Sequence, residues 1–274
     1  MVNVAIEAAK EAGKFLKFNL GKVKEIERKV GQETNLVTEI DRQSEQLIIG
    51  IIKRHFPHHD FLAEESGLRL AQSGAKGEKK SEYRWIIDPL DGTVNYTHHF
   101  PCFAVSIGLE KSGEIILGVV YDPNLDEIFS AEKRRGAFVN GKRLSVSKAD
   151  ALIRSLLVTG FPYNIKDNPD HAIEHFINFL KEAQAIRRMG SAAIDLAYVA
   201  AGRIDAFWEV SLNPWDTAAG VLLVEEAGGK VTNFLGSAYS IYEKPILASN
   251  GLIHEEMIRV LKKGEDQGAK RFVS

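Results

Sequence analysis

Cysteine is almost absent from the sequence, with Cys102 as the single example among 274 residues. One cysteine excludes a disulfide bond within the chain and any zinc site built from several cysteines. The N-terminal residues 1–20 also lack a long apolar run, because charged side chains interrupt the apolar ones, and they resemble neither a signal peptide nor a membrane span. These absences favour a cytoplasmic protein that does not bind membranes.

The chain also lacks a large excess of charge of either sign, because its formal net charge is only -2. A broad basic surface is therefore not expected, and binding to nucleic acid through bulk electrostatics is disfavoured. The composition is 45% hydrophobic and 26% charged, which is typical of a folded globular chain. The length suits one large domain or two closely packed ones, and the charge balance suits an enzyme that acts on small molecules.

Residues 85–93 (WIIDPLDGT) combine an apolar strand with two carboxylates. Pro89 disfavours the helical conformation at Asp88, so we expect the strand to end at that aspartate and a turn to follow. Asp88 and Asp91 supply the hard oxygen ligands that Mg²⁺ prefers, and the backbone carbonyl of Leu90 can add a third. The composition of this turn predicts a magnesium site.

The end of the same stretch suits a phosphate group. Gly92 allows the backbone to approach a ligand closely, and a helix that begins near Thr93 would direct its free N–H groups at the same point. The alternative is a surface turn of the Pro-x-Asp-Gly type with no functional role.

Helical periodicity predicts a helix over residues 1–20 and a second from about Thr38 to His55, with an inner face of Leu47, Ile48, Ile51, Ile52 and Phe56. Four short segments separated by turn residues then predict antiparallel strands over residues 104–109, 115–121, 127–131 and 137–139.

Acidic residues occur at the ends of two of these segments. Thr38 and Asp41 have the spacing of a capping box, so Asp41 has either a capping role alone or a functional one. Glu64 and Glu65 follow the apolar run 61–63, and because neighbouring side chains of an extended segment point in opposite directions, only one of them can face a given site.

Strands alternate with helices from about residue 151, which predicts an α/β second half. Three helix starts are expected in it, at Asn168-Pro169, at Ser191 and at Asn213-Pro214. Asp216 falls in the first turn of the last helix, where a carboxylate could simply stabilise the helix dipole by about 0.3–1 kcal/mol.

Several motifs together resemble the inositol monophosphatase family of Mg²⁺-dependent, Li⁺-sensitive phosphatases, particularly its bacterial members. The motifs are 37–41 (VTEID), 64–67 (EESG), 85–93 (WIIDPLDGT), 187–193 (RRMGSAA), 214–216 (PWD) and 226–229 (EAGG). They follow one another over nearly the whole chain. The resemblance implies a layered αβαβα sandwich, with a mostly antiparallel N-terminal subdomain at residues 1–150, an α/β C-terminal subdomain at 151–274, and a homodimer.

The resemblance also implies two or three Mg²⁺ ions. Glu64, Asp88 and the Leu90 carbonyl would hold the first ion, and Asp88, Asp91 and Asp216 the second. Asp41, Glu64 and Thr93 would form the catalytic group that orients and activates a water molecule. His98 and His99 are neighbours in the sequence, and such neighbours rarely bind the same zinc ion. We therefore interpret them as surface histidines rather than zinc ligands.

The substrate implied is a small phosphorylated polyol or sugar, with inositol 1-phosphate first. The residues implied to contact it are Leu90, Asp91, Gly92, Thr93, Arg187, Gly190, Ser191, Ala192, Glu209 and Asp216. The alternatives are fructose 1,6-bisphosphate, 3′-phosphoadenosine 5′-phosphate and histidinol phosphate, whose phosphatases share the metal carboxylates. A regulatory partner protein that keeps the fold without turnover is a further alternative. Residues 29–35 resemble the mobile loop of the family.

Overall fold

The computed structural model describes residues 1–22, 26–28, 36–70 and 81–271. The helices are α1 (Val2–Asn19), α2 (Glu39–His55), α3 (Thr93–Thr97), α4 (Ala172–Glu182), α5 (Ala192–Ala200), α6 (Pro214–Glu226) and α7 (His254–Arg271), with short 3-10 turns at Leu152–Arg154, Ile165–Asp167 and Pro169–His171. None of the helices in the described ranges combines the length and the apolar character that a membrane crossing requires. The predicted loop 29–35 and most of the polar stretch 71–82 lie outside the described residues.

The larger sheet has eight strands in the order β10-β9-β8-β7-β6-β5-β3-β4, and the smaller has five in the order β12-β11-β13-β15-β14. The bounds of the larger sheet are β3 (Asp60–Ala63), β4 (Gly67–Arg69), β5 (Tyr83–Asp91), β6 (Ala104–Lys111), β7 (Glu114–Asp122), β8 (Glu127–Glu132), β9 (Gly136–Val139) and β10 (Lys142–Arg143). Those of the smaller are β11 (Leu156–Thr159), β12 (Ala185–Arg187), β13 (Ala206–Glu209), β14 (Lys230–Thr232) and β15 (Ile246–Ser249). A separate pair consists of β1 (Ile26–Arg28) and β2 (Leu36–Thr38).

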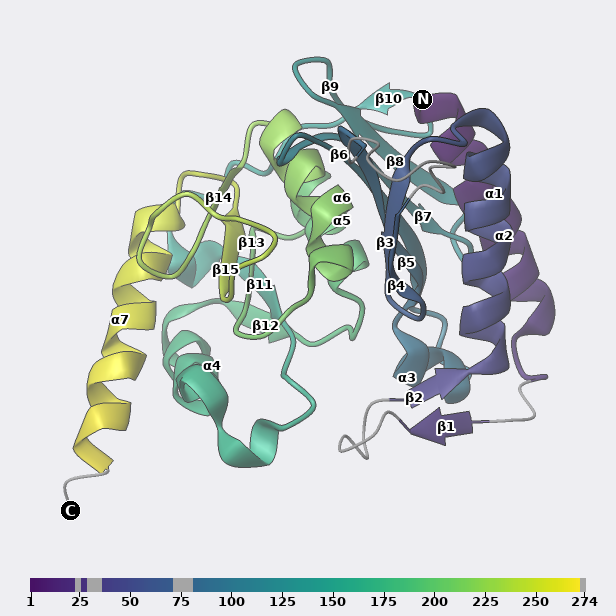
Figure 1. Ribbon diagram of the computed structural model, residues 1–274. Helices are drawn as coiled ribbons and strands as arrows, with labels where there is room; N and C mark the ends of the chain where they lie inside the picture. The colour runs from purple at the N-terminus through teal and green to yellow at the C-terminus, as the bar shows by residue number, and fades with distance from the viewer. Residues whose placement is uncertain (23–25, 29–35, 71–80, 272–274) are drawn as a thin grey trace.

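The elements stack in alternating layers (Figure 1). Helices α1 and α2 cover the outer face of the larger sheet, α5 and α6 lie between the two sheets, and α4 and α7 cover the far face of the smaller sheet. The larger sheet is antiparallel except where β3 runs parallel to β5, whereas β11 runs parallel to both β12 and β13. The predicted αβαβα sandwich is confirmed. The division near residue 150 stays a prediction, because the core between the sheets contains residues from both halves.

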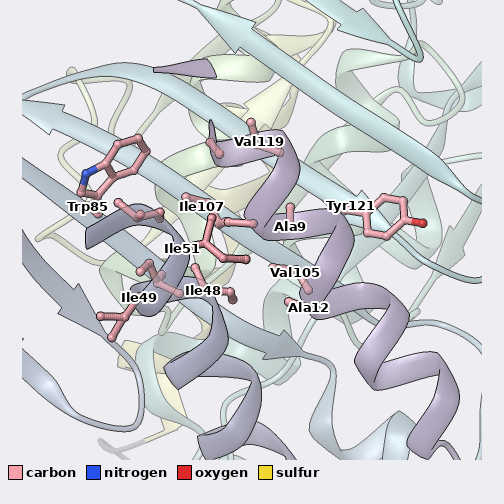
Figure 2. Packing of buried hydrophobic residues seen from close by; sticks show 14 of the residues in the cluster. Ala9, Ala12, Ile48, Ile49, Ile51, Trp85, Val105, Ile107, Val119 and Tyr121 are labelled. Carbon is pink, nitrogen blue, oxygen red and sulfur yellow. The ribbon is translucent and has the colours of Figure 1, made fainter. Parts of the chain in front are cut away.

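The outer layer packs through small side chains on one helix and isoleucines on the other. Figure 2 shows Ala9 and Ala12 of α1 and Ile48 and Ile51 of α2 against the sheet. The predicted inner face of α2 was wrong at one position, because Leu47 is 36% exposed while Ile49 is 7% exposed. Apolar residues are nearly continuous from 47 to 52, so periodicity alone could not fix how the helix is rotated.

Strand β5 differs from the prediction that it ends at Asp88, because it continues to Asp91 through an irregularity. Asp88 pairs with Ser106 and Asp91 with Ala104, so two residues of β5 lie opposite one residue of β6. Pro89 is tolerated because pairing with β3 has already ended at Ile87, so no partner requires its missing N–H group. The extra residue brings the two aspartates, which an even strand would point to opposite faces, to the same face.

Helix α6 lies close against the larger sheet and so brings its first turn to the end of β5. A Cβ atom added at Gly118 of β7 would come within 2.6 Å of the Ala219 carbonyl oxygen, so glycine permits this approach. The Ser106 hydroxyl of β6 also donates to the Trp215 carbonyl at 3.2 Å. The first turn of α6 is thereby held against β6, next to the end of β5 that carries Asp88 and Asp91.

Two of the three predicted helix starts in the second half are confirmed. Ser191 caps α5 by accepting a hydrogen bond from the Ile194 N–H, and Asn213 caps α6. The start at Asn168-Pro169 was wrong, because a 3-10 turn follows there and α4 begins at Ala172. Asn168 has a φ of 47°, which is left-handed and incompatible with the extended backbone of an N-cap.

Candidate active site

A cavity of about 440 Å³ opens where β3, β5, α5, β13 and α6 meet. Nearly all of the residues predicted from the sequence to form the site line it: Glu64, Asp88, Leu90, Asp91, Gly92, Thr93, Gly190, Ser191, Ala192, Glu209 and Asp216. They come from segments up to about 150 residues apart in the chain, so the fold gathers a site that the sequence showed only as separate motifs.

Glu64 is the first residue after β3. Its backbone N–H donates to the Ile87 carbonyl at 3.1 Å, which continues the pairing with β5 by one residue. Glu64 lines the cavity and Glu65 does not. The expectation that only one of the two carboxylates faces the site is therefore confirmed.

Asp88 and Asp91 are both held by backbone N–H groups. The Leu90 N–H donates to Asp88 Oδ1 at 3.0 Å. Asp91 Oδ2 accepts the Ser191 hydroxyl at 2.5 Å and the Ala193 N–H at 2.7 Å, so it binds the first turn of α5. Each of these bonds uses one carboxylate oxygen and leaves the other oxygen of the same group for a ligand.

Asp216 forms a capping box with Asn213, whose N–H donates to Asp216 Oδ2 at 2.6 Å. The structural role considered for this residue is thus present. The same side chain also lines the cavity, so capping and a role in the site are compatible.

Burial and mutual repulsion dominate the electrostatics of these carboxylates. Burial raises the pKa of Asp88 well above its ordinary value, and the charges of Glu64, Asp91 and Asp216 raise it further. Burial and then Glu64 raise the pKa of Asp216 in the same way. The pKa of Asp91 is raised to about 6 by burial, although its hydrogen bond from Ser191 opposes the shift. Ionised together, these groups would destabilise one another unless a cation bound among them.

The composition of the cavity lining fits divalent metal ions. Six lining residues carry carboxyl groups, and among the described residues of the lining only Arg188 and Lys244 carry a positive charge. Hard oxygen donors of this kind suit Mg²⁺. No three histidine, cysteine or acidic side chains within the described ranges are already placed to hold one ion. The fit to a metal ion therefore rests on the kind of donor atoms that line the cavity.

Asp41 divides its two oxygens between two roles. Oδ2 accepts the Thr38 N–H at 2.8 Å and the Thr38 hydroxyl at 2.5 Å, which completes the predicted capping box of α2. Oδ1 accepts the Thr93 hydroxyl at 3.0 Å, and that hydroxyl also lies 3.1 Å from the Leu90 carbonyl. Burial raises the pKa of Asp41 to about 6. The sequence posed capping and function as alternatives, and the geometry accommodates both.

Gly92 has a φ of 97° and forms the left-handed start of α3. A Cβ atom there would lie 3.0 Å from the Cys102 carbonyl oxygen and 3.2 Å from that of Gly190, so both conformation and space favour glycine. Helix α3 begins at Thr93, as expected.

One predicted contact residue lies outside the cavity lining. Arg187 is exposed at the end of β12, where its guanidinium donates to the neighbouring Ile186 carbonyl, and it does not line the cavity. Arg188 lines the cavity instead, because adjacent residues of an extended segment point in opposite directions. The sequence could not say which of the two arginines faces inward.

Tyr163, Asp195 and Lys244 are among the lining residues that were not predicted from the sequence. Asp195 is 1% exposed, and its Oδ1 has no hydrogen-bond partner. Burial and the nearby Glu209 raise its pKa well above the ordinary value. Its position in the first turn of a helix capped by Ser191 was the available signal, although a carboxylate there is common for electrostatic reasons alone.

Glu209 ends β13 and is 7% exposed. Burial raises its pKa to about 8, although Arg188 opposes the shift. Gly160 provides the space for this side chain, because a Cβ atom there would lie 2.1 Å from Glu209 Oε2.

Comparison with known proteins gives matches over nearly the whole chain. Residues 1–265 match the model of the Inositol monophosphatase family. The chain is 44% identical to an inositol-1-monophosphatase of Synechocystis, over 95% of this chain and 88% of that protein. It is 40% identical to the Nus factor SuhB of Pseudomonas aeruginosa, over 99% of both chains. The crystal structure of the extragenic suppressor protein suhB from Bartonella henselae superposes with a TM-score of 0.88 at 41% identity, over 96% of this chain and 98% of that one.

Proposed function

The chain belongs to the inositol monophosphatase family, and on that premise we propose that it is a Mg²⁺-dependent phosphatase whose preferred substrate is inositol 1-phosphate. The observation that carries the proposal is the convergence of Glu64, Asp88, Asp91 and Asp216 in one cavity, beside the hydrogen-bonded pair of Asp41 and Thr93. A phosphate monoester is an anion, and a cavity this rich in carboxylates would repel it without metal cations.

The carboxylates fit the metal sites that the family resemblance implies. Glu64, Asp88 and the Leu90 carbonyl would hold one Mg²⁺, and Asp88, Asp91 and Asp216 a second, with Asp88 shared between them. Bound magnesium would neutralise phosphate charge and make a water molecule more acidic.

The remaining chemistry falls to side chains of the protein. Because the Thr93 hydroxyl donates its proton to Asp41 Oδ1, its lone pairs are free to accept a hydrogen bond from water. Asp41, with its pKa raised to about 6, is suited to receive a proton near neutral pH. The pair thus provides a path for the proton that the attacking water loses, and Glu64 would help to orient that water.

The alcohol part of the substrate would lie toward Glu209 and Arg188. A carboxyl group at Glu209 can exchange hydrogen bonds with the hydroxyl groups of a polyol, and Arg188 can bind an oxygen anion. Gly92 and Thr93 would donate backbone N–H groups to the phosphate, and residues 190–192 complete the wall of the cavity.

A phosphate-release panel tests this function. We expect the protein to hydrolyse inositol 1-phosphate in Mg²⁺ with a higher kcat/KM than fructose 1,6-bisphosphate, adenosine 3′,5′-bisphosphate or histidinol phosphate. Chelation of Mg²⁺ should abolish turnover and Li⁺ should inhibit it. A preference for one of the other substrates would move the assignment within the family, and no release from any of them would refute it.

A second candidate is a regulatory role through a partner protein, which the name Nus factor SuhB of a relative 40% identical over 99% of both chains favours. Such a role would depend on the surface rather than on the cavity. It would be supported if Asp88→Asn, without phosphatase activity, restored the phenotype of a strain lacking the gene as well as the wild-type protein does.

We also propose that the protein is a homodimer in the cytoplasm. The outer face of α4 exposes Ile173, Ile177 and Leu180, at 39%, 39% and 59%, in a stripe at helical spacing that a second subunit could cover. Light scattering should give twice the 30.4 kDa mass of the chain, and a monomer at micromolar concentration would contradict this part of the proposal.

A further inference from the structure

One face of α2 contacts the candidate site at three separate points. Ser44 and Glu45 follow Asp41 by three and four residues, so both lie on the face of the helix that carries Asp41. Asp41 accepts the Thr93 hydroxyl, as described above. The Ser44 hydroxyl donates to the Pro89 carbonyl at 2.9 Å, within the irregular part of β5. Glu45 reaches the turn that follows β3.

The Glu45 side chain is 2% exposed and accepts two backbone hydrogen bonds through one oxygen. Its Oε2 accepts the Glu65 N–H at 2.8 Å and the Ser66 N–H at 3.3 Å. Its Oε1 lies 3.7 Å from the guanidinium of Arg69, whose side chain is 48% exposed. The Glu64 N–H is already bound to the Ile87 carbonyl, so three successive N–H groups of this turn are fixed by partners outside it.

We infer that Glu45 is a positioning residue for metal binding, which holds the 64–66 turn so that Glu64 faces the cavity before any ion arrives. The inference rests on the proposed function, in which Glu64 is a metal ligand. Residues 64–66 form the turn between β3 and β4, and a rotation of the backbone in this turn would direct the Glu64 side chain away from the cavity. Glu45 opposes that rotation because it fixes the two N–H groups that would have to move.

The physical basis is preorganisation. A ligand side chain that is already directed at the ion loses less conformational freedom on binding, and groups that orient metal ligands typically change metal affinity by about 10- to 100-fold when they are removed. A buried carboxylate is a strong acceptor for two N–H groups, and its second oxygen faces Arg69, which partly balances its charge. Neither role requires Glu45 to touch the metal or the substrate.

The first test measures the turn itself without metal, by hydrogen exchange of the Glu65 and Ser66 amides. In Glu45→Ala both amides should exchange at least about tenfold faster, while amides in β6 keep their wild-type rates. Glu45→Gln retains an acceptor oxygen and should restore most of the protection. Arg69→Ala, the matched control, removes the ion pair without removing the acceptor and should leave both amides protected. Unchanged exchange in Glu45→Ala would overturn the inference.

The second test measures equilibrium binding of Mn²⁺ by calorimetry or by the electron spin signal of the free ion. Glu45→Ala should weaken binding by about 10-fold or more, Glu45→Gln by much less, and Arg69→Ala by less than about twofold. If Glu45→Ala does not fold, Glu45→Asp keeps the charge, shortens the reach by one methylene and should still weaken binding measurably. Wild-type affinity in the folded variants would refute the positioning role. A wild-type protein that binds no Mn²⁺ would instead refute the proposed metal site, and the exchange rates would still decide whether Glu45 fixes the turn.

Discussion

Replacement of Asp41 by asparagine separates the two roles that the structure gives this residue. Asparagine can accept the Thr38 N–H through its oxygen and present its NH₂ group to Thr93, whose hydroxyl can then donate to the Leu90 carbonyl at 3.1 Å. The capping box of α2 would therefore persist, because the side-chain oxygen of asparagine can accept the hydrogen bonds that Thr38 donates to Asp41 Oδ2. The ability to receive a proton would be lost.

The size and sign of the stability change follow from the raised pKa. The pKa of Asp41 rises from 3.8 to about 6, so the folded state binds this proton more tightly than the unfolded state does. The stability that the protonated group contributes is complete below about pH 3.8 and is lost as the pH rises through 6. Above that pH the buried charge costs up to about 3 kcal/mol, which asparagine removes. The melting temperature of metal-free Asp41→Asn at pH 8 should therefore stay constant or rise.

Turnover should respond in the opposite direction. Loss of a general base reduces rates by about 10²–10⁴-fold, so kcat of Asp41→Asn should fall by that factor in saturating Mg²⁺. The assay is phosphate release per folded molecule, with unfolding followed by circular dichroism. Thr38→Ala is the control, because it weakens the cap by about 1 kcal/mol and leaves Thr93 in place. A stable Asp41→Asn with a rate near that of the wild type, or an unstable one with an intact rate per folded molecule, would refute the proton-accepting role.

Three further predictions concern Asp88 and Glu209. Asp88→Asn should leave less than about a tenth of the wild-type rate in saturating Mg²⁺, because an amide lacks the negative charge that would bind two cations. A higher rate would exclude a bridging role. Glu209→Gln should narrow the preference for inositol 1-phosphate over fructose 1,6-bisphosphate more at pH 9 than at pH 7, because the wild-type pKa of about 8 leaves the group largely uncharged at pH 7; an unchanged ratio of kcat/KM at both pH values would remove Glu209 as a specificity determinant. In urea titrations, the stability of the metal-free wild-type protein should decline between pH 4.5 and 8 by up to about 5 kcal/mol more than that of Glu209→Gln. The stability due to the raised pKa of Glu209 is complete below about pH 4.5 and is lost as the pH rises through 8. Parallel curves would contradict the assigned shift.

The layered fold was implied by the resemblance to the family, whereas periodic patterns and turn residues predicted individual helices and strands. Turn residues bound strands β6 to β8, and Ser191 and Asn213 are the N-caps of two helices. The irregularity in β5 was not predictable, since a proline after Asp88 signals a turn equally well. Only pairing with β6 shows that the chain continues as a strand and that one extra residue aligns Asp88 with Asp91.

The candidate site was likewise predictable only in part. Motifs identified the acidic residues but not their orientation, so Arg188 rather than Arg187 reaches the cavity. The two roles of Asp41 were posed as alternatives because a sequence does not show that separate oxygens of one carboxylate can serve both. Glu45 carried no motif, and its importance for the turn after β3 emerges only from a contact twenty residues along the chain.

Diffraction from crystals soaked in Mn²⁺, recorded where manganese scatters anomalously, tests the central claim most directly. We expect anomalous peaks inside the cavity, one at coordination distance from Glu64 and Asp88 and a second at coordination distance from Asp88, Asp91 and Asp216. The Asp88→Asn protein, treated in the same way, should lose both peaks or show them much weakened. A saturating soak that places no manganese among these carboxylates, or places it on other residues, would contradict the account.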